Sequence, residues 1–221
     1  MHVFVKQVMR HPQRDFILFV LTNFPTKRHG FDPELPRVKY LYCYDPADDN
    51  LTLLGQIGHH PCWHPQQPWV ISYTPDANGV WHLVYDKLTA TGVEREWLSY
   101  KSRSGHPSVS PDGRFIVTDN YSRLSDYVAV DLFDPVTGRD IELARYSKHV
   151  QTEKQSQPVS RRKAGETFAD FVRRTSLGPE KNTVVQAHPV WDRSGRWVLF
   201  NTGVTGKSQL CLIDVNEALG L

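Results

Sequence analysis

The segment His106–Asn120, HPSVSPDGRFIVTDN, decides the fold because it recurs along the chain. HPCWHPQQPWVISYT, from His60 to Thr74, and HPVWDRSGRWVLFNT, from His188 to Thr202, align with it without a gap. A shortened copy, HPQRDFILFVLTN, begins at His11. Each copy joins a His-Pro pair to a turn and an apolar run, so the chain is built from a repeated unit.

Each unit continues in the same order, with a second apolar stretch that ends in an aspartate: Asp45, Asp86, Asp131 and Asp214. Three units then carry a further run, LTLLGQ, REWLSY or IELARY. Asp112-Gly113 and Ser194-Gly195 are typical of tight turns between strands. Each unit therefore predicts up to four antiparallel strands, with the His-Pro pair at the start of the first strand, where proline is tolerated.

The unit starts lie 49, 46 and 82 residues apart, and the first two intervals match the period of propeller blades. We predict an all-β fold, a β-propeller with about four blades starting near residues 11, 60, 106 and 188. The whole chain, residues 1–221, would form one propeller domain or a propeller fragment. The last unit stops after its third strand, so Val3-Phe4-Val5 is expected either to pair with it and close the ring or to belong to a chain cut from a larger ring.

Composition supports strands and excludes several classes of protein. The chain has 25 aromatic residues (10 Phe, 9 Tyr and 6 Trp), 14 Gly and 15 Pro, which argues against a helical bundle. Tryptophans recur at matching offsets and are expected between blades: Trp63, Trp69, Trp191 and Trp197. Three widely spaced cysteines predict neither a disulfide framework nor a cysteine zinc site.

Charge and hydropathy give expectations about partners and location. The net charge is +2, so no nucleic acid is expected as a partner. The longest apolar run, Phe16 to Leu21, is too short to span a bilayer, and no signal peptide is seen. We expect no membrane partner and a cytoplasmic location, or a periplasmic one if the true N-terminus lies upstream.

Residues 148–187 lack strand periodicity and form an insertion between the third and fourth units. They carry eight Lys or Arg against four acidic residues, and Phe168, Phe171 and Val172 predict a short amphipathic helix. One interpretation is a solvated surface loop. The other is a basic lid over the channel mouth, which would favour an anionic ligand.

The first strand of a propeller blade lines the central channel, so His60, His106 and His188 are expected to converge, with His59, His64 and Gln186 nearby. Clustered imidazoles can bind a divalent metal or act as acid and base. The alternative is that each histidine only caps a strand, and His11 is expected to be structural.

A polar segment of the third unit, TDNYSRLSDY, places Tyr121 and Arg123 after its second strand. Arginine can grip a carboxylate and tyrosine can transfer a proton, although an ordinary turn has the same composition. The chain contains no GxxxxGK[ST], GxSxG, HExxH or GxGxxG motif. A hydrolase with an activated serine is therefore poorly supported.

The stretches SGHPSVSPDGRFIVTDNY, QAHPVWDRSGRWVLFNT and GKSQLCLID resemble TolB-type propeller repeats, particularly those of the oligogalacturonate lyase family and related propeller polysaccharide lyases. The resemblance covers about residues 58–146 and 185–215. It implies a seven-bladed ring, of which this chain would hold about four blades. It also implies metal-assisted β-elimination of uronate-containing oligosaccharides, with Mn²⁺ as the metal.

Carried onto this chain, the resemblance implies that His106, Gln186 and His188 hold the metal. On the mechanism that follows, Arg123 binds the substrate carboxylate, and His60 or Tyr121 transfers the proton. Two alternatives stay open. The chain can be a non-catalytic TolB-like module that binds a protein or glycan, or an inactive truncated lyase fragment whose incomplete ring favours self-association.

Overall fold

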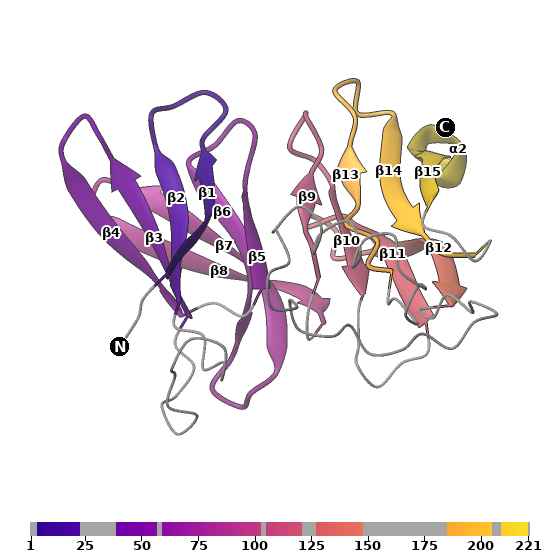
Figure 1. The fold of residues 1–221 in the computed structure, drawn as a ribbon, viewed down its shortest axis with the longest axis horizontal. Coiled ribbons are helices and arrows are strands. Elements are labelled where there is room, and N and C mark those ends of the chain that lie inside the picture. The colour runs from indigo at the N-terminus through magenta and orange to yellow at the C-terminus, as the bar shows by residue number, and fades with distance from the viewer. Residues whose placement is uncertain are drawn as a thin grey trace, which may run out of the picture.

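The computed structural model describes residues 4–22, 39–56, 59–102, 105–120, 127–147, 185–204 and 209–220. In these ranges the chain forms four separate antiparallel sheets that stand side by side, followed by one short helix (Figure 1). Each sheet is built from strands that are consecutive in sequence and paired with their immediate neighbours. The predicted all-β propeller with about four blades is confirmed.

Three of the blades have four strands and the last has three. Blade 1 contains β1 (Phe4–Arg10), β2 (Ile17–Thr22), β3 (Lys39–Asp45) and β4 (Asn50–Gln56). Blade 2 contains β5 (His59–Trp63), β6 (Trp69–Pro75), β7 (Trp81–Thr89) and β8 (Gly92–Lys101). Blade 3 contains β9 (Ser108–Val109), β10 (Ile116–Asn120), β11 (Tyr127–Phe133) and β12 (Asp140–Ser147). Blade 4 contains β13 (Val190–Trp191), β14 (Trp197–Thr202) and β15 (Gln209–Asp214), and α2 (Val215–Leu219) follows it.

The hydrophobic core lies between the blades, because alternate residues of a strand point to opposite faces of its sheet. In β6, Val70 packs in one cluster with Leu18 of blade 1. The next residue, Ile71, packs in another cluster with Ile116 of blade 3. A third cluster joins blades 3 and 4. Every described neighbouring pair of blades is thus held by buried apolar side chains.

Two tryptophans connect the first strands of neighbouring blades through side-chain hydrogen bonds. The indole N–H of Trp63 donates to the carbonyl oxygen of Met9 at 3.1 Å, and that of Trp191 donates to Ser108 at the same distance. Each tryptophan lies three residues after a His-Pro histidine, so the two bonds are equivalent in the repeat. Strand β9 also contacts both β5 and β13, which brings the first strands of blades 2, 3 and 4 side by side.

The structure corrects the alignment of the first unit. Strand β1 ends at Arg10, so His11 follows the first strand and does not open it. The backbone N–H of His11 donates to Phe16, just as that of His64 donates to Trp69. His11 is therefore equivalent to His64, and its structural role in a turn agrees with expectation.

Of the two alternatives for the N-terminal strand, closure of the ring with the last blade is not what the described residues show. Strand β1 pairs with β2 as the first strand of blade 1, and the sheet of blade 4 contains only β13, β14 and β15. The reason is the register of the repeat: once His11 matches His64, the residues before it fill the first-strand position.

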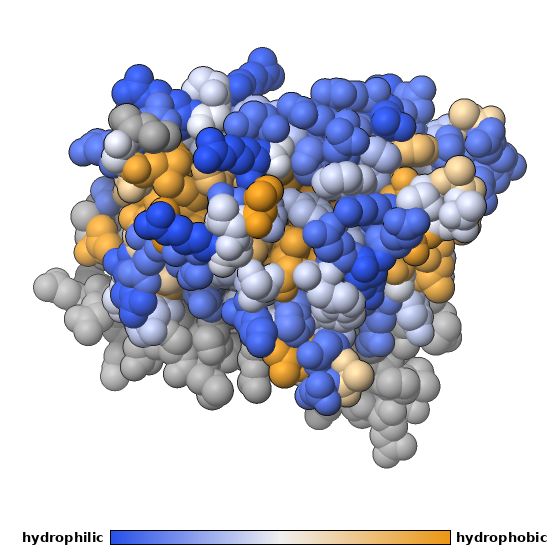
Figure 2. Space-filling model, turned by 180° about the vertical axis from the view of Figure 1, so that it is seen from behind, coloured by the Kyte–Doolittle hydropathy of each residue, from blue (hydrophilic) through white to orange (hydrophobic). Residues whose placement is uncertain are grey.

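The outward faces of the two end blades carry exposed apolar side chains. Val5 and Leu53 in blade 1 are 59% and 51% exposed, and Leu210 and Leu212 in blade 4 are 66% and 59% exposed. Figure 2 shows hydrophobic residues toward both ends of the long axis. Figure 1 places blades 1 and 4 at the two ends of the row of sheets. Within the described ranges, no helix has the length and apolar character to cross a membrane.

Candidate functional site

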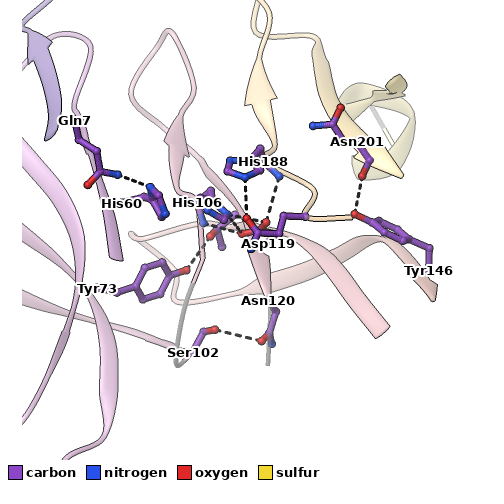
Figure 3. Close-up of polar contacts among 12 residues, drawn as sticks. Gln7, His60, Tyr73, Ser102, His106, Asp119, Asn120, Tyr146, His188 and Asn201 are labelled. Carbon is purple, nitrogen blue, oxygen red and sulfur yellow. Dashed lines mark hydrogen bonds and ion pairs between the residues drawn. The ribbon is translucent and has the colours of Figure 1, made fainter. Parts of the chain in front are cut away.

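Four side chains at equivalent positions of the four blades form the candidate site: Gln7, His60, His106 and His188 (Figure 3). The ring centroids of His106 and His188 lie 3.7 Å apart, and those of His60 and His106 lie 4.2 Å apart. His60 and His188 are separated by 6.1 Å. The expected convergence of the three histidines is confirmed: His60 is the second residue of β5, and His106 and His188 each lie two residues before the first strand of their blade.

The backbone is distorted where these side chains enter the site. The register of β1 shifts between Lys6 and Met9, and that of β5 shifts between His59 and Cys62. Such bulges redirect a side chain away from the regular pleat. Gln7 and His188 also have φ angles of +53° and +45°, in the left-handed region that disfavours residues other than glycine. Backbone strain of this kind is often concentrated at functional sites.

Asp119 on β10 organises the centre of the site. Its carboxylate is fully buried and accepts the backbone N–H of His106 at 2.7 Å and that of His188 at 3.2 Å. It also accepts a hydrogen bond from Nδ1 of His106 at 2.9 Å. Burial raises the pKa of Asp119, but the hydrogen bonds and charge of His106 and the His188 N–H outweigh it and the pKa is lowered. The ionised carboxylate therefore links blade 3 to blade 4.

The bond to Asp119 fixes the proton of His106 on Nδ1. Neutral His106 then presents the lone pair of Nε2, which is the form that accepts a proton or binds a metal. Metal-bound histidines usually donate their other N–H to a carboxylate in this way. Asp119 and Asn120 are the last two residues of strand β10.

His188 is oriented by a different partner. Its Nε2 lies 3.0 Å from the side-chain oxygen Oε1 of Gln186, which can only accept, so Nε2 carries the proton of that bond. Desolvation and the neighbouring His106 lower the pKa of His188, while Asp119 opposes the shift. The three residues predicted to hold a metal thus lie together in space.

Gln7 is the site residue that sequence reasoning missed. Its side-chain amide nitrogen Nε2 is hydrogen bonded to Nδ1 of His60. A signal was present: His11 lies four residues after Gln7, as His64 lies four residues after His60, and both are followed by Pro-Gln. The extra His-Pro pair inside blade 2 obscured this register.

His64 does not join the site, contrary to expectation. It follows the far end of β5, where its Nδ1 accepts the backbone N–H groups of Gln66 and Gln67. Its ring packs closely against Gly113, since a Cβ atom there would lie 2.6 Å from the ring. Burial lowers the pKa of His64. His64 is therefore a structural residue at the junction of blades 2 and 3.

Several predicted features lie outside the described residues. They are Tyr121, Arg123 and residues 148–184 of the predicted insertion. In the described part of the chain, no three His, Cys, Asp or Glu side chains form a group able to hold a metal. The predicted metal ligands are two histidines, His106 and His188, and one amide, Gln186, so they are not a group of that kind. Imidazole nitrogen and amide oxygen, with a carboxylate behind His106, are donor types that divalent metals use in proteins.

Comparisons with known proteins identify the fold. No family model and no curated protein matches the chain. TolB from Acinetobacter baumannii superimposes with a TM-score of 0.55 at 13% identity, over 96% of this chain and 41% of that chain. The β-propeller domain of the Trilobed protease from Pyrococcus furiosus, described as having an open velcro topology, gives 0.54 at 8% identity, over 96% and 54%.

An oligogalacturonate lyase in complex with manganese is also similar, with a TM-score of 0.40 at 14% identity, over 93% of this chain and 64% of that chain. At that TM-score it adds no argument about this chain. The chain spans 41 to 64% of these three solved structures. At identities of 8 and 13%, the likeness to TolB and to the protease propeller confirms a β-propeller fold and nothing finer.

Proposed function

We propose that this β-propeller is carbohydrate-active and cleaves oligogalacturonate or another uronate-containing oligosaccharide by β-elimination at the site of Gln7, His60, His106 and His188. The observation that carries the proposal is the hydrogen bond between the buried Asp119 and Nδ1 of His106. The ring centroids of His60 and His188 lie 4.2 and 3.7 Å from that of His106. Such an oriented cluster is suited to proton transfer and to binding a charged ligand.

The chemistry of the reaction explains why these residue types are useful. Base-catalysed elimination removes the proton at C5 of the uronate, forms the C4–C5 double bond and breaks the C4–O bond, whose oxygen takes up a proton. The C5 proton becomes acidic only when negative charge building on the adjacent carboxylate is stabilised. On this proposal Arg123 binds that carboxylate, and His60 or Tyr121 transfers the proton.

We further propose that His106, Gln186 and His188 hold a divalent metal, with Mn²⁺ as the first candidate. Bound there, the ion would neutralise the substrate carboxylate as a Lewis acid. The contribution of the chain's own residues is orientation: Asp119 holds the ring of His106, and Gln186 holds that of His188. Loss of such supporting bonds typically reduces metal affinity about 10- to 100-fold.

The test combines metal analysis with detection of the unsaturated product formed from oligogalacturonate. We expect metal-dependent product formation by the wild type and its loss in His106→Ala and His188→Ala. The matched control is His82→Ala, because His82 also pairs with an aspartate, Asp76 at 3.2 Å, but sits on β7 against Trp97. Unchanged metal content and unchanged cleavage in both site variants would end the proposal.

A second function is favoured by the exposed apolar faces of the end blades. In a non-catalytic module these faces would bind another β-blade, and a second copy of this chain supplies one. Leu210 and Leu212 would then be buried in the complex. Association that rises with concentration and is abolished by Leu212→Asp, together with no metal and no product, would support this alternative. A monomer at all concentrations would exclude the self-association.

A further inference from the structure

We infer that Gln7 is a positioning residue that fixes His60 as a neutral hydrogen-bond donor. The amide nitrogen of Gln7 is bonded to Nδ1 of His60. An amide nitrogen only donates, so Nδ1 accepts and the ring proton of neutral His60 is on Nε2. The use made of that N–H rests on the proposed function, but the position of the proton does not.

The place of Gln7 in the repeat supports a role in the site. It occupies the position that is histidine in the other three blades, four residues before the turn of its own blade. The bulge in β1 lies at this residue, and the same irregularity occurs at His60–Pro61 in β5. Both side chains are thereby turned out of the regular pleat of their first strands and face one another (Figure 3).

The position is also unfavourable for stability. Gln7 has a φ angle of +53°, and its side-chain oxygen Oε1 is buried with no hydrogen-bond partner among the described residues. A buried polar atom without a partner lowers stability, and an apolar side chain at this position would avoid that loss. Packing alone does not explain a glutamine at a position with a positive φ angle and a buried, unpaired side-chain oxygen. The hydrogen bond to His60 does explain it.

Neighbouring imidazoles are thus held in opposite tautomers. His106 has its proton on Nδ1, directed to Asp119, whereas His60 has its proton on Nε2. Their ring centroids are only 4.2 Å apart. The two neighbouring rings therefore differ in which nitrogen carries the proton.

This arrangement narrows the role of His60 in the proposed elimination. A neutral imidazole N–H can stabilise negative charge that develops on an oxygen, as a hydrogen-bond donor. In a uronate the oxygen that gains charge is that of the carboxylate. On the proposed function His60 is then a hydrogen-bond donor to the carboxylate and not the base that removes the C5 proton.

The experiment is ring-nitrogen NMR of the full chain at a pH where the imidazoles are neutral. We expect His60 to carry its proton on Nε2 in the wild type. In Gln7→Glu the carboxylate accepts, so the proton should move to Nδ1. In Gln7→Leu the change in chemical shift that the hydrogen bond causes at Nδ1 of His60 should disappear. The melting temperature of this variant should be unchanged or raised. Gln66→Leu, an exposed glutamine outside the site, should leave the His60 signals unchanged.

A wild-type His60 with its proton on Nδ1 would overturn the inference, and so would unchanged His60 signals in both Gln7 variants. The wild-type measurement keeps the inference testable if a variant does not fold. In the cleavage assay, Gln7→Glu should lower kcat/KM at least tenfold while Gln66→Leu does not. If the wild type shows the Nε2 tautomer but no cleavage, the proposed function fails and the assignment of Gln7 stands.

Discussion

Asp119→Ala gives the sharpest test of how the site is built. The substitution removes a fully buried carboxylate that accepts two backbone N–H groups and the ring N–H of His106. A hydrogen bond to a charged group contributes about 1.5–3 kcal/mol, and a buried donor left without a partner costs about 1–3 kcal/mol. His188 lies at the exposed side of the site, so water can replace the acceptor for its N–H.

The substitution therefore leaves two N–H groups of His106 without an acceptor, which lowers stability, and removes a buried charge, which raises it. We expect the free energy of unfolding to fall by about 2–4 kcal/mol in total. Urea unfolding should show a lower midpoint at an unchanged slope. Asp86→Ala is the matched control, because Asp86 is equally buried and binds Arg95 at 2.6 Å, away from the site. Both variants should lose stability, and only Asp119→Ala should release the His106 tautomer. A change below about 0.5 kcal/mol in Asp119→Ala would show that these hydrogen bonds do not stabilise the fold.

Three further predictions follow from single residues. In Gly105→Ala the new Cβ would lie 2.5 Å from the Asp119 carbonyl oxygen and 2.6 Å from Thr118 Oγ1, so we expect a loss of about 1–3 kcal/mol in urea unfolding, and wild-type stability would contradict the packing. Hydrogen bonds from Ser194 and the Trp197 backbone lower the pKa of Asp192 to about 2, so its contribution to stability is present above its unfolded pKa of about 4 and is lost as the pH falls toward 2. Melting curves of Asp192→Asn and wild type should converge over that pH range, and parallel curves would contradict it. Leu18→Ala, at a fully buried position, should cost about 2–5 kcal/mol, whereas Leu212→Ala, at 59% exposure, should cost less than about 0.5 kcal/mol unless a partner covers it.

The blades were predictable because each unit repeats the same turn residues and the same alternation of apolar positions. Gly113 and Gly195 both adopt positive φ in the turn between the first two strands, and neighbouring positions of β6 face opposite blades. A pattern of this kind is local, and a sequence displays it directly. The convergence of His60, His106 and His188 followed from their common register.

The remaining parts of the site depend on contacts between segments distant in sequence. The bond from the backbone of His188 to Asp119 spans 69 residues, and nothing local to Asp119 indicates it. Gln7 was missed because the units were aligned by their His-Pro pairs, and blade 2 contains two such pairs. His11 was aligned with His60, whereas in the structure it is equivalent to His64. The error at His11 also kept open the alternative of a ring closed by the N-terminal strand, which the described residues do not show.

The central claim is that the histidine cluster performs elimination on a uronate. The most direct measurement is the absorbance of unsaturated product when oligogalacturonate and Mn²⁺ are incubated with the wild type, His106→Ala and the control His82→Ala. The account predicts product with the wild type and the control and a loss of at least a hundredfold with His106→Ala. Equal product formation by His106→Ala, or none by the wild type, would contradict it.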